Sequence, residues 1–301
     1  MGLSVNKANS LRVGIIGFGE VGQIFAKSLL EKTDDVFIYD ILAQNSQSFM
    51  ADKISSIGAQ VVERIEQLGE YCTLIFSLVS SSASETVASG IAKKIGKGTI
   101  FVDLTTSTPQ VKTRSEKLIE ATGGIYVDAS IMGTVATEQQ QVPLLIAGEH
   151  SEKIQKLLTK LGFNCQAISL PTGGAASIKL LRSIFMKGLE ALILETMITA
   201  KNYGVSDEVM ESISKTINNN DFTTFARALI TTHAIHKNRR YKEVLDSCNL
   251  INEAGFPPCV TEGVISFFSN STKMDIDQKI IESHDVEKIL DQYSLMNIVN
   301  H

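Results

Sequence analysis

The sequence predicts an α/β protein, with a doubly wound, mostly parallel sheet in an N-terminal domain and a smaller all-helical domain after it. Short apolar runs alternate with helical patterns over the first 170 residues, and one of these runs leads into a glycine-rich turn. Strand patterns largely vanish after Pro171. The length of 301 residues accommodates two domains, which we predict at 1–170 and 171–301.

Strand and helix patterns follow one another in order along the first domain. Apolar runs predict strands at 12–18, 36–40, near Val61, and at 73–79, 99–104, 125–130, 143–148 and 163–169. Apolar positions at helical spacing, or polar helix-forming segments, predict helices at 20–32, up to about Ser56, and at 84–94, 109–121 and 151–161.

The second domain begins with one long helical pattern over residues 175–203, which is apolar around most of its circumference. A helix of this kind is buried between domains or between subunits, so we expect a homodimer or a larger homo-oligomer. Further helical segments follow, with a break at 255–258, and the segment after Ser271 is charged and helical in pattern.

Composition excludes several classes of function. The net charge of -5 and the pI of about 5.6 argue against nucleic acid as a partner, because phosphate binding needs a basic face. No run of apolar residues is long enough to predict a membrane span, and residues 1–10 lack the apolar stretch of a secretory signal. The four cysteines lie far apart, which indicates free thiols in a reducing compartment, and we therefore expect a cytoplasmic protein.

A glycine-rich turn follows the first predicted strand and opens the first predicted helix. It reads Gly17, Phe18, Gly19, Glu20, Val21, Gly22, and matches the pattern G-x-G-x-x-G. In this pattern the first glycine allows the tight turn, the second lets a pyrophosphate approach the backbone, and the third lets helix and strand pack closely. The helix N-terminus offers N–H groups to the phosphates. This context predicts a Rossmann fold that binds a dinucleotide; the alternative is a glycine turn without a ligand.

Asp40 ends the second predicted strand, 23 residues after Gly17. A carboxylate at this place accepts hydrogen bonds from ribose hydroxyls and repels a 2′-phosphate. Ile41 and Leu42 follow, so no arginine is at hand to hold that phosphate. NAD is therefore favoured over NADP; the alternative for Asp40 is a turn-forming aspartate at a strand end.

Four segments resemble the β-hydroxyacid dehydrogenases, a superfamily that includes 3-hydroxyisobutyrate dehydrogenase, tartronate semialdehyde reductase and the NAD-binding part of 6-phosphogluconate dehydrogenase. They are the glycine-rich turn, DLTTSTP at 103–109, DASIMGT at 128–134 and GGAASIK at 173–179. The resemblance is strong over the first 190 residues and looser after them. It implies an NAD(P)-dependent enzyme that transfers hydride between the nicotinamide and a small (3-)hydroxy acid, in the cleft between the two domains.

Two of these segments imply contacts beside the nicotinamide and the substrate. The first is similar to D-x-S-T-x-x-P, which implies that Thr106 contacts the nicotinamide; an ordinary helix cap is the alternative. The second is similar to D-A-P-V-S-G-G, which binds the substrate carboxylate and implies roles for Met132, Gly133 and Thr134. Met132 replaces the serine and Thr134 the last glycine, and these departures predict a bulkier, more apolar pocket; a plain strand-to-loop turn is the alternative.

The fourth segment resembles G-x-x-x-x-K, which implies that Lys179 is the catalytic lysine. A lysine in an apolar helix near its N-terminus loses hydration, its pKa falls, and it can then exchange a proton with the substrate. Ser183 stands where the family usually has asparagine, four residues beyond the lysine. A lysine whose ammonium reaches solvent from the helix surface is the alternative.

The helical domain contributes a basic cluster. Lys242 and Glu243 match a Lys-Asp pair whose lysine, in the family, reaches the nicotinamide side of the cleft. His236, Arg239 and Arg240 are predicted to bind an anionic substrate, and a solvated basic helix face is the alternative. No third ligand accompanies the histidines at 233 and 236, so no metal is expected.

Other functions remain open at this point. The chain also resembles the imine reductases, which share this architecture but have Asp or Tyr at the position of Lys179. A 6-phosphogluconate dehydrogenase would need a much longer helical domain. A dinucleotide-binding sensor without catalysis is compatible with the departures at Met132 and Ser183.

Overall fold

The computed structural model describes residues 11–33, 35–44, 48–219 and 221–297. The N-terminal segment, for which the sequence predicts no secretory signal, lies outside these residues. The chain divides into two compact units, Met1–Ser183 and Ile184–His301. The division falls within one long helix, α8 (Gly174–Tyr203), whereas the sequence predicts the domain boundary near residue 171.

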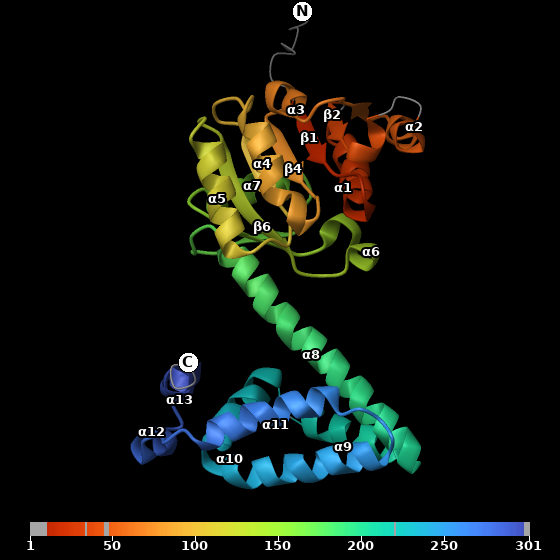
Figure 1. The fold of residues 1–301 in the computed structure, drawn as a ribbon. Coiled ribbons are helices and arrows are strands. Elements are labelled where there is room, and N and C mark those ends of the chain that lie inside the picture. Colours follow the sequence, from red (N-terminus) through yellow and green to blue (C-terminus); the bar gives the residue numbers. More distant parts are fainter. Residues whose placement is uncertain (1–10, 34, 45–47, 220, 298–301) are drawn as a thin grey trace, which may run out of the picture. The chain divides into compact units, whose positions relative to one another are not determined.

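Within the described residues, the first unit contains one eight-stranded sheet with the order β3-β2-β1-β4-β5-β6-β7-β8. The strands are β1 (Val13–Ile16), β2 (Val36–Tyr39), β3 (Gln60–Val61), β4 (Leu74–Ser77), β5 (Ile100–Asp103), β6 (Ile125–Ile131), β7 (Leu144–Ala147) and β8 (Cys165–Ala167). All pairings are parallel except β6 with β7. The strand order reverses between β1 and β4, so the predicted doubly wound, mostly parallel sheet is confirmed (Figure 1).

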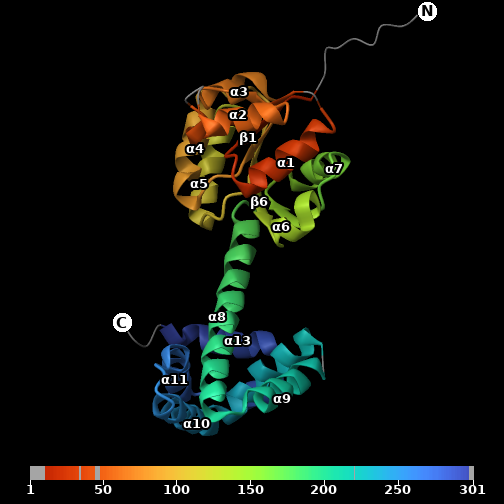
Figure 2. The same cartoon turned by 90° about the vertical axis from the view of Figure 1, so that its right-hand side faces the viewer.

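Helices cover both faces of this sheet (Figure 2). They are α1 (Glu20–Leu30), α2 (Phe49–Ser56), α3 (Glu66–Tyr71), α4 (Ser84–Ala92), α5 (Pro109–Glu120), α6 (Val135–Glu138) and α7 (Ser151–Lys160), with short 3₁₀ turns at Ile41–Ala43, Ser81–Ala83 and Gln139–Gln141. Apolar side chains of α1, α2 and α7 share one core with the sheet, and those of α3, α4 and α5 share a second core on the opposite face.

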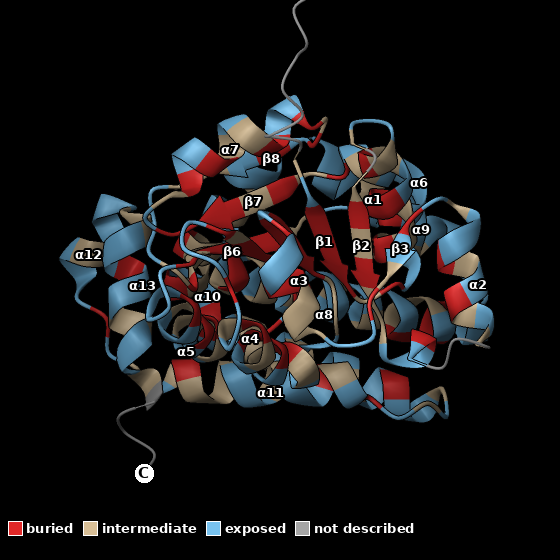
Figure 3. Cartoon of the chain, turned by 90° about the horizontal axis from the view of Figure 1, so that it is seen from above, coloured by how far each residue is buried: buried red, intermediate tan, exposed pale blue. Residues whose placement is uncertain are grey.

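The strands feed both cores because successive side chains point to opposite faces of a sheet. In β4, Leu74 and Phe76 belong to the first core and Ile75 to the second. Figure 3 shows the central strands buried along their length, which agrees with the continuous apolar runs in their sequences. Three aromatic rings anchor the first core, with Phe25 lying 6.2 Å from Phe76 and 4.8 Å from Phe163 between ring centroids.

The described part of the second unit is helical, as predicted. It comprises the C-terminal part of α8, then α9 (Ser206–Asn218), α10 (Phe222–Glu253), α11 (Cys259–Thr272), α12 (Gln278–Ser283) and α13 (Val286–Ser294), with a 3₁₀ turn at Leu295–Asn297. The buried carboxylate of Glu195 in α8 accepts the backbone N–H groups of Val260 and Thr261, and thereby satisfies the N-terminus of α11.

The long helix α8 confirms the predicted span, but much of its apolar surface is exposed in the single chain. Leu181 is 65% and Ile184 is 70% exposed. Burial of this helix between domains or between subunits stays a prediction, because an apolar pattern reports a preference for leaving water and not which molecule supplies the cover.

No helix of the described residues combines the length and the apolar run that a bilayer crossing requires. The four cysteines are free, and two of them, Cys72 and Cys165, are buried. Burial raises the pKa of each of these two thiols to about 12, so both are held as inert thiols at neutral pH.

We predict that Phe25→Ala destabilises the first unit by about 3–5 kcal/mol, because it removes a fully buried ring between two other rings. Urea unfolding monitored by circular dichroism measures the change. Phe49→Ala is the matched control, since that side chain is 80% exposed and its loss leaves the transition nearly unmoved. Equal effects of the two variants would contradict the assigned core.

Candidate functional site

Two glycines of the turn after β1 are required by the packing of the protein itself. Gly17 has a φ of 93°, a conformation that side chains rarely adopt, and a Cβ there would lie 3.0 Å from the carbonyl oxygen of Leu78. A Cβ on Gly22 would lie 2.1 Å from the carbonyl oxygen of Gly17. These contacts fix the close approach of α1 to β1 that the pattern predicts.

Gly19 differs, because nothing in the protein lies within 4 Å of a Cβ built on it. It is the N-cap of α1 and provides no side-chain hydrogen bond to the helix, which then begins with Glu20 and Val21. The first N–H groups of α1 therefore remain for an acceptor outside the helix. Open space in front of a helix N-terminus suits a phosphate group.

Asp40 lies directly beside this turn. Its Oδ2 accepts the N–H of Phe18 at 2.7 Å, and its Oδ1 accepts the N–H of Leu42 at 2.8 Å. The side chain of Phe18 is fully buried in the first core, so this residue shapes the turn through its backbone. Each oxygen of Asp40 accepts one N–H in these two bonds, which leaves capacity for a further donor such as a ribose hydroxyl.

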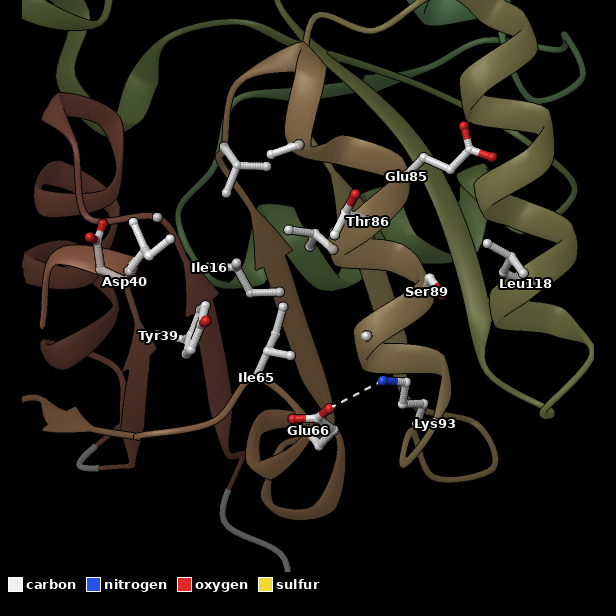
Figure 4. A pocket seen from close by; sticks show the side chains of 16 residues that line it. Ile16, Tyr39, Asp40, Ile65, Glu66, Glu85, Thr86, Ser89, Lys93 and Leu118 are labelled. Atoms are coloured by element: carbon white, nitrogen blue, oxygen red, sulfur yellow. Dashed lines mark ion pairs between the residues drawn. The ribbon is translucent and has the colours of Figure 1, made fainter. Parts of the chain in front are cut away.

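A cavity of about 810 Å³ opens beside Asp40 at the carboxyl ends of β1, β2 and β4 (Figure 4). Ile16, Ile65 and Val79 contribute apolar walls. Charged side chains at its edge come from Asp40, Glu66, Glu85 and Lys93. Nζ of Lys93 lies 3.7 Å from Oε1 of Glu66, and Nη2 of Arg114 lies 2.8 Å from Oε2 of Glu85. The positive charges near this edge are therefore paired with carboxylates. The sequence analysis missed these wall residues, since no spacing marks them.

A second cluster lies at the carboxyl end of β5 and beside it in the middle of β6, and was not predicted from the sequence. Lys112 of α5 is fully buried. Its Nζ lies 3.1 Å from Oδ1 of Asp103 and 3.5 Å from Oδ1 of Asp128, and it donates to the backbone oxygen of Asp103 at 2.7 Å. Two buried carboxylates thus share one buried ammonium.

Further hydrogen bonds hold Asp103 in its charged form. Its Oδ2 accepts the hydroxyls of Tyr126 at 2.6 Å and Ser84 at 3.1 Å, and its Oδ1 accepts the N–H of Thr105 at 2.9 Å. Burial alone would raise the pKa of Asp103, but the charge of Lys112 and these hydrogen bonds outweigh it and leave the pKa below its ordinary value. Burial and the neighbouring Asp103 raise the pKa of Tyr126 well above its ordinary value.

Asp128 connects the same cluster to the beginning of α8. Its Oδ2 accepts three backbone N–H groups, from Gly173 at 3.0 Å, Ala175 at 3.1 Å and Ala176 at 3.2 Å. This carboxylate therefore takes the place of an N-cap side chain for α8. The cluster brings together the end of β5, the middle of β6 and the first turn of α8, which are the three remaining segments of the predicted site.

Lys179 lies on the next turn of α8 and is half-buried. Burial lowers the pKa of its amine, and the positive charges of Lys112 and Arg182 lower it further. This direction agrees with the expectation for a lysine that exchanges protons near neutral pH. Ser183 follows four residues later on the same helix face, also half-buried.

The hydroxyl residues after β5 divide into two groups. Thr105 and Ser107 are buried and hydrogen-bonded to each other at 2.7 Å. Thr108 caps α5 by accepting the N–H of Val111 at 3.4 Å. Thr106 is exposed between them, so the helix cap and the predicted nicotinamide contact are different residues.

The predicted carboxylate-binding loop follows β6 directly. Met132 is half-buried and donates its N–H to the oxygen of Pro143 at 2.8 Å. The N–H of Thr134 is donated to Oε1 of Glu138 at 2.9 Å. That oxygen also lies close above Gly133, where a Cβ would meet it at 2.1 Å. The chain thus supplies its own carboxylate to this loop.

The remaining predicted residues lie on α10 in the second unit. His236, Arg239 and Lys242 are exposed, and Arg239 is paired with Glu243 one turn away. Arg240 donates to the hydroxyl of Thr232 at 2.9 Å. Across the described residues, no three His, Cys, Asp or Glu side chains gather in a way that could hold a metal ion.

Comparison with known proteins agrees with this geometry. The family described as the NAD binding domain of 6-phosphogluconate dehydrogenase matches residues 12–169, more than half of the chain, and a domain of unknown function, DUF1932, matches residues 200–270. Mitochondrial 3-hydroxyisobutyrate dehydrogenase of Bos taurus is 30% identical over 195 residues, which cover 62% of this chain and 56% of that enzyme.

Solved structures show the same fold. A conserved protein of unknown function, described as similar to 3-hydroxyacid dehydrogenases, is 28% identical with a TM-score of 0.59, over 87% of this chain and 97% of its own. An imine reductase variant from Myxococcus stipitatus, solved with NAD⁺, has a TM-score of 0.73 at 17% identity, over 92% of this chain and 99% of its own. The resemblance predicted from the sequence is confirmed, and the chain belongs to the family of the NAD-binding domain of 6-phosphogluconate dehydrogenase.

Proposed function

We propose that the protein is an oxidoreductase that uses a nicotinamide dinucleotide to interconvert the alcohol and carbonyl forms of a small hydroxy acid. The observation that carries this proposal is the open N-terminus of α1 at Gly19, beside a cavity edged by Asp40. Membership of an NAD-binding family and the similarity to 3-hydroxyisobutyrate dehydrogenase support it.

The residues present fit such a cofactor. Gly19 leaves room for a pyrophosphate against the N–H groups of α1, and the cavity beside Asp40 has apolar walls for an adenine. NAD is the cofactor we propose in preference to NADP, because Asp40, Glu66 and Glu85 stand at the edge of this cavity, where a 2′-phosphate would need cations. Lys93, the cation among the lining residues, is paired with Glu66.

Lys179 is the proposed acid and base. A nicotinamide held at this site would supply the hydride for the reduction and would accept it in the oxidation. During oxidation the neutral amine of Lys179 takes the proton of the substrate hydroxyl, and during reduction its ammonium returns a proton to the carbonyl oxygen. Burial and the charges of Lys112 and Arg182 lower the pKa of this amine, which favours the neutral form that the oxidation requires. We propose Thr106, Gly133 and Ser183 as lining residues of the same site.

A neutral carbonyl compound or imine is a second candidate for the substrate. Met132 offers no hydroxyl to a substrate carboxylate, and the N–H of Thr134 is already donated to Glu138. Both observations favour a substrate that needs no carboxylate recognition at this loop. The similarity to imine reductases concerns the fold. At the position of Lys179, enzymes of that kind are expected to have Asp or Tyr.

In the second unit, we propose that basic residues of α10 bind an anionic group, and that Lys242 is a cofactor-binding residue. They are the exposed residues at 236, 239 and 242 and the half-buried Arg240. We also propose that the apolar surface of α8 associates with a second copy of the chain. Ile184 and Leu194 of this helix are each more than half exposed in the second unit, and exposed apolar side chains of this size favour an association that removes them from water.

We predict that Gly19→Ala weakens NADH binding about tenfold or more, because its Cβ would hold the pyrophosphate away from the N–H groups of α1. Fluorescence titration with NADH and, separately, NADPH measures the affinity and tests the proposed preference for NAD. The fold is expected to stay intact, since the new Cβ meets nothing. Gly188→Ala also adds a Cβ in open space, and should leave binding unchanged. Unaltered affinity in Gly19→Ala would remove the main support for the cofactor site.

We predict that Lys179→Ala lowers turnover about 10²- to 10⁴-fold while NADH binding survives, because only the proton transfer is lost. The assay follows NADH absorbance over a panel of 3-hydroxy acids, their carbonyl forms, neutral aldehydes and cyclic imines. Turnover of imines alone would favour the second candidate. NADH binding without turnover of any compound would favour a sensor, and full turnover in Lys179→Ala would refute the role of Lys179.

For the proposed association, we predict a dimer or larger assembly by light scattering at micromolar concentration, and a shift toward monomer in Leu194→Glu. A charge placed on an apolar contact cannot be desolvated cheaply. Lys187→Glu changes an exposed charged residue on the same helix and serves as the control. A wild-type protein that stays monomeric as concentration rises would rule out the association.

A further inference from the structure

The buried charges of the first unit include a group that the proposed reaction does not use. The side chain of Lys112 is completely buried, with 0% of its surface exposed. Burying an ammonium is costly unless its partners compensate for lost water, and here Asp103 and Asp128 do so. A buried ion pair is weak evidence for stability, because apolar residues of similar size often serve as well. The position of this pair is therefore the informative feature.

Asp103 and Asp128 lie side by side in the sheet. The parallel pairing of β5 and β6 places them in register. Each is the first residue of a segment of the proposed site, 103–109 and 128–134. Lys112 joins the two carboxylates from the neighbouring helix α5. Its ammonium thus ties the β5–α5 loop, which carries Thr106, to the strand that leads to Gly133.

The same carboxylate of Asp128 holds the first turn of α8. It accepts the N–H groups of Ala175 and Ala176, and Lys179 is one turn further along. In a helix, position 179 lies on the same face as 175, and a long side chain leans back over the preceding turn. The charge of Lys112 acts on the amine of Lys179, whose pKa it lowers.

We propose that Lys112 is a positioning residue of the active site: through Asp128 it fixes the first turn of α8, and its buried charge disfavours a second positive charge on Lys179. This inference rests on the proposed function of Lys179 as acid and base. It assigns to Lys112 a task that neither the sheet nor the core requires.

Other charged groups of the first unit also face this region. On α5, Glu116 accepts a hydrogen bond from Thr172, just before α8. On α8 itself, Arg182 follows Lys179 by three residues, and its charge acts in the same direction as that of Lys112. Negative charges such as those of Asp103 and Asp128 favour the charged form of a nearby amine and so oppose this effect. The effect of Lys112 is therefore one contribution among several and has to be isolated by substitution.

Coulomb's law gives the direction in which each substitution changes the pKa of Lys179. Removal of the positive charge in Lys112→Met favours the charged form of Lys179 and raises its pKa. Removal of the negative charge in Asp128→Asn, which keeps an oxygen for the N–H groups of α8, disfavours the charged form and lowers the pKa. A purely structural loss would instead expose Lys179 in both variants and move both pKa values the same way, upward.

The experiment measures the reactivity of Lys179 with acetic anhydride, which acylates the neutral amine, by mass spectrometry of the full-length protein across a range of pH. The exposed Lys187 on the same helix is the internal reference. We expect Lys112→Met to label about tenfold less than wild type at a fixed pH below the midpoint, and Asp128→Asn to label more. Tyr126→Phe, which removes a hydrogen bond to Asp103 but keeps Lys112 and Asp128, is the matched control and leaves the midpoint unmoved.

Where Lys112→Met alone does not fold, the double variant Lys112→Met/Asp128→Asn removes one positive and one negative charge and so keeps the net charge of the cluster, and it is compared with Asp128→Asn. Adding Lys112→Met to that background is expected to raise the midpoint. Shifts of equal sign in the two single variants, or no shift from the loss of Lys112 in either background, would overturn the inference. The labelling needs no substrate, so its outcome is separate from the turnover of Lys179→Ala, which tests the proposed function.

Discussion

The first unit depends on how two carboxylates and one ammonium are held in a place that water does not reach. Asp103 at the end of β5 and Asp128 in the middle of β6 are paired in register on neighbouring strands, and Lys112 contacts both. One uncompensated negative charge would remain, but the three N–H groups at the beginning of α8 and the hydroxyls of Tyr126 and Ser84 distribute it. The start of α8 is therefore set by a strand and a helix far earlier in the chain.

This arrangement also explains how three loops at one edge of the sheet keep a common geometry. A doubly wound sheet brings its strand ends together but leaves the loops free to vary. Here hydrogen bonds of Thr105 and Ser107 hold the β5–α5 loop, and Asp128 of β6 holds the N-terminal N–H groups of α8. A site built on elements held in this way can keep its groups in register without relying on the loops alone.

Periodicity and turn chemistry predicted most of the fold, because the central strands are buried on both faces and read as continuous apolar runs. The glycine-rich turn was also predictable, because a Cβ at Gly17 or Gly22 would collide with backbone atoms and the packing therefore requires glycine there. The burial of Lys112 was not predicted, because a lysine at a helical position is typical of a solvated face and its two partners come from different strands. What covers the apolar surface of α8 is not predicted for a related reason: a sequence shows which surface is apolar, and not what lies against it.

The candidate site was predicted residue by residue from a resemblance, and the structure refines what each residue is free to do. Thr108 caps α5, so Thr106 remains exposed, while Glu138 takes the N–H of Thr134. Asp40 bears further on recognition. Both of its oxygens are held by Phe18 and Leu42 within the protein itself, so the carboxylate has its direction before any nucleotide arrives. A preorganised acceptor loses little conformational entropy on binding, and selectivity for the sugar is then decided by shape and charge already in place.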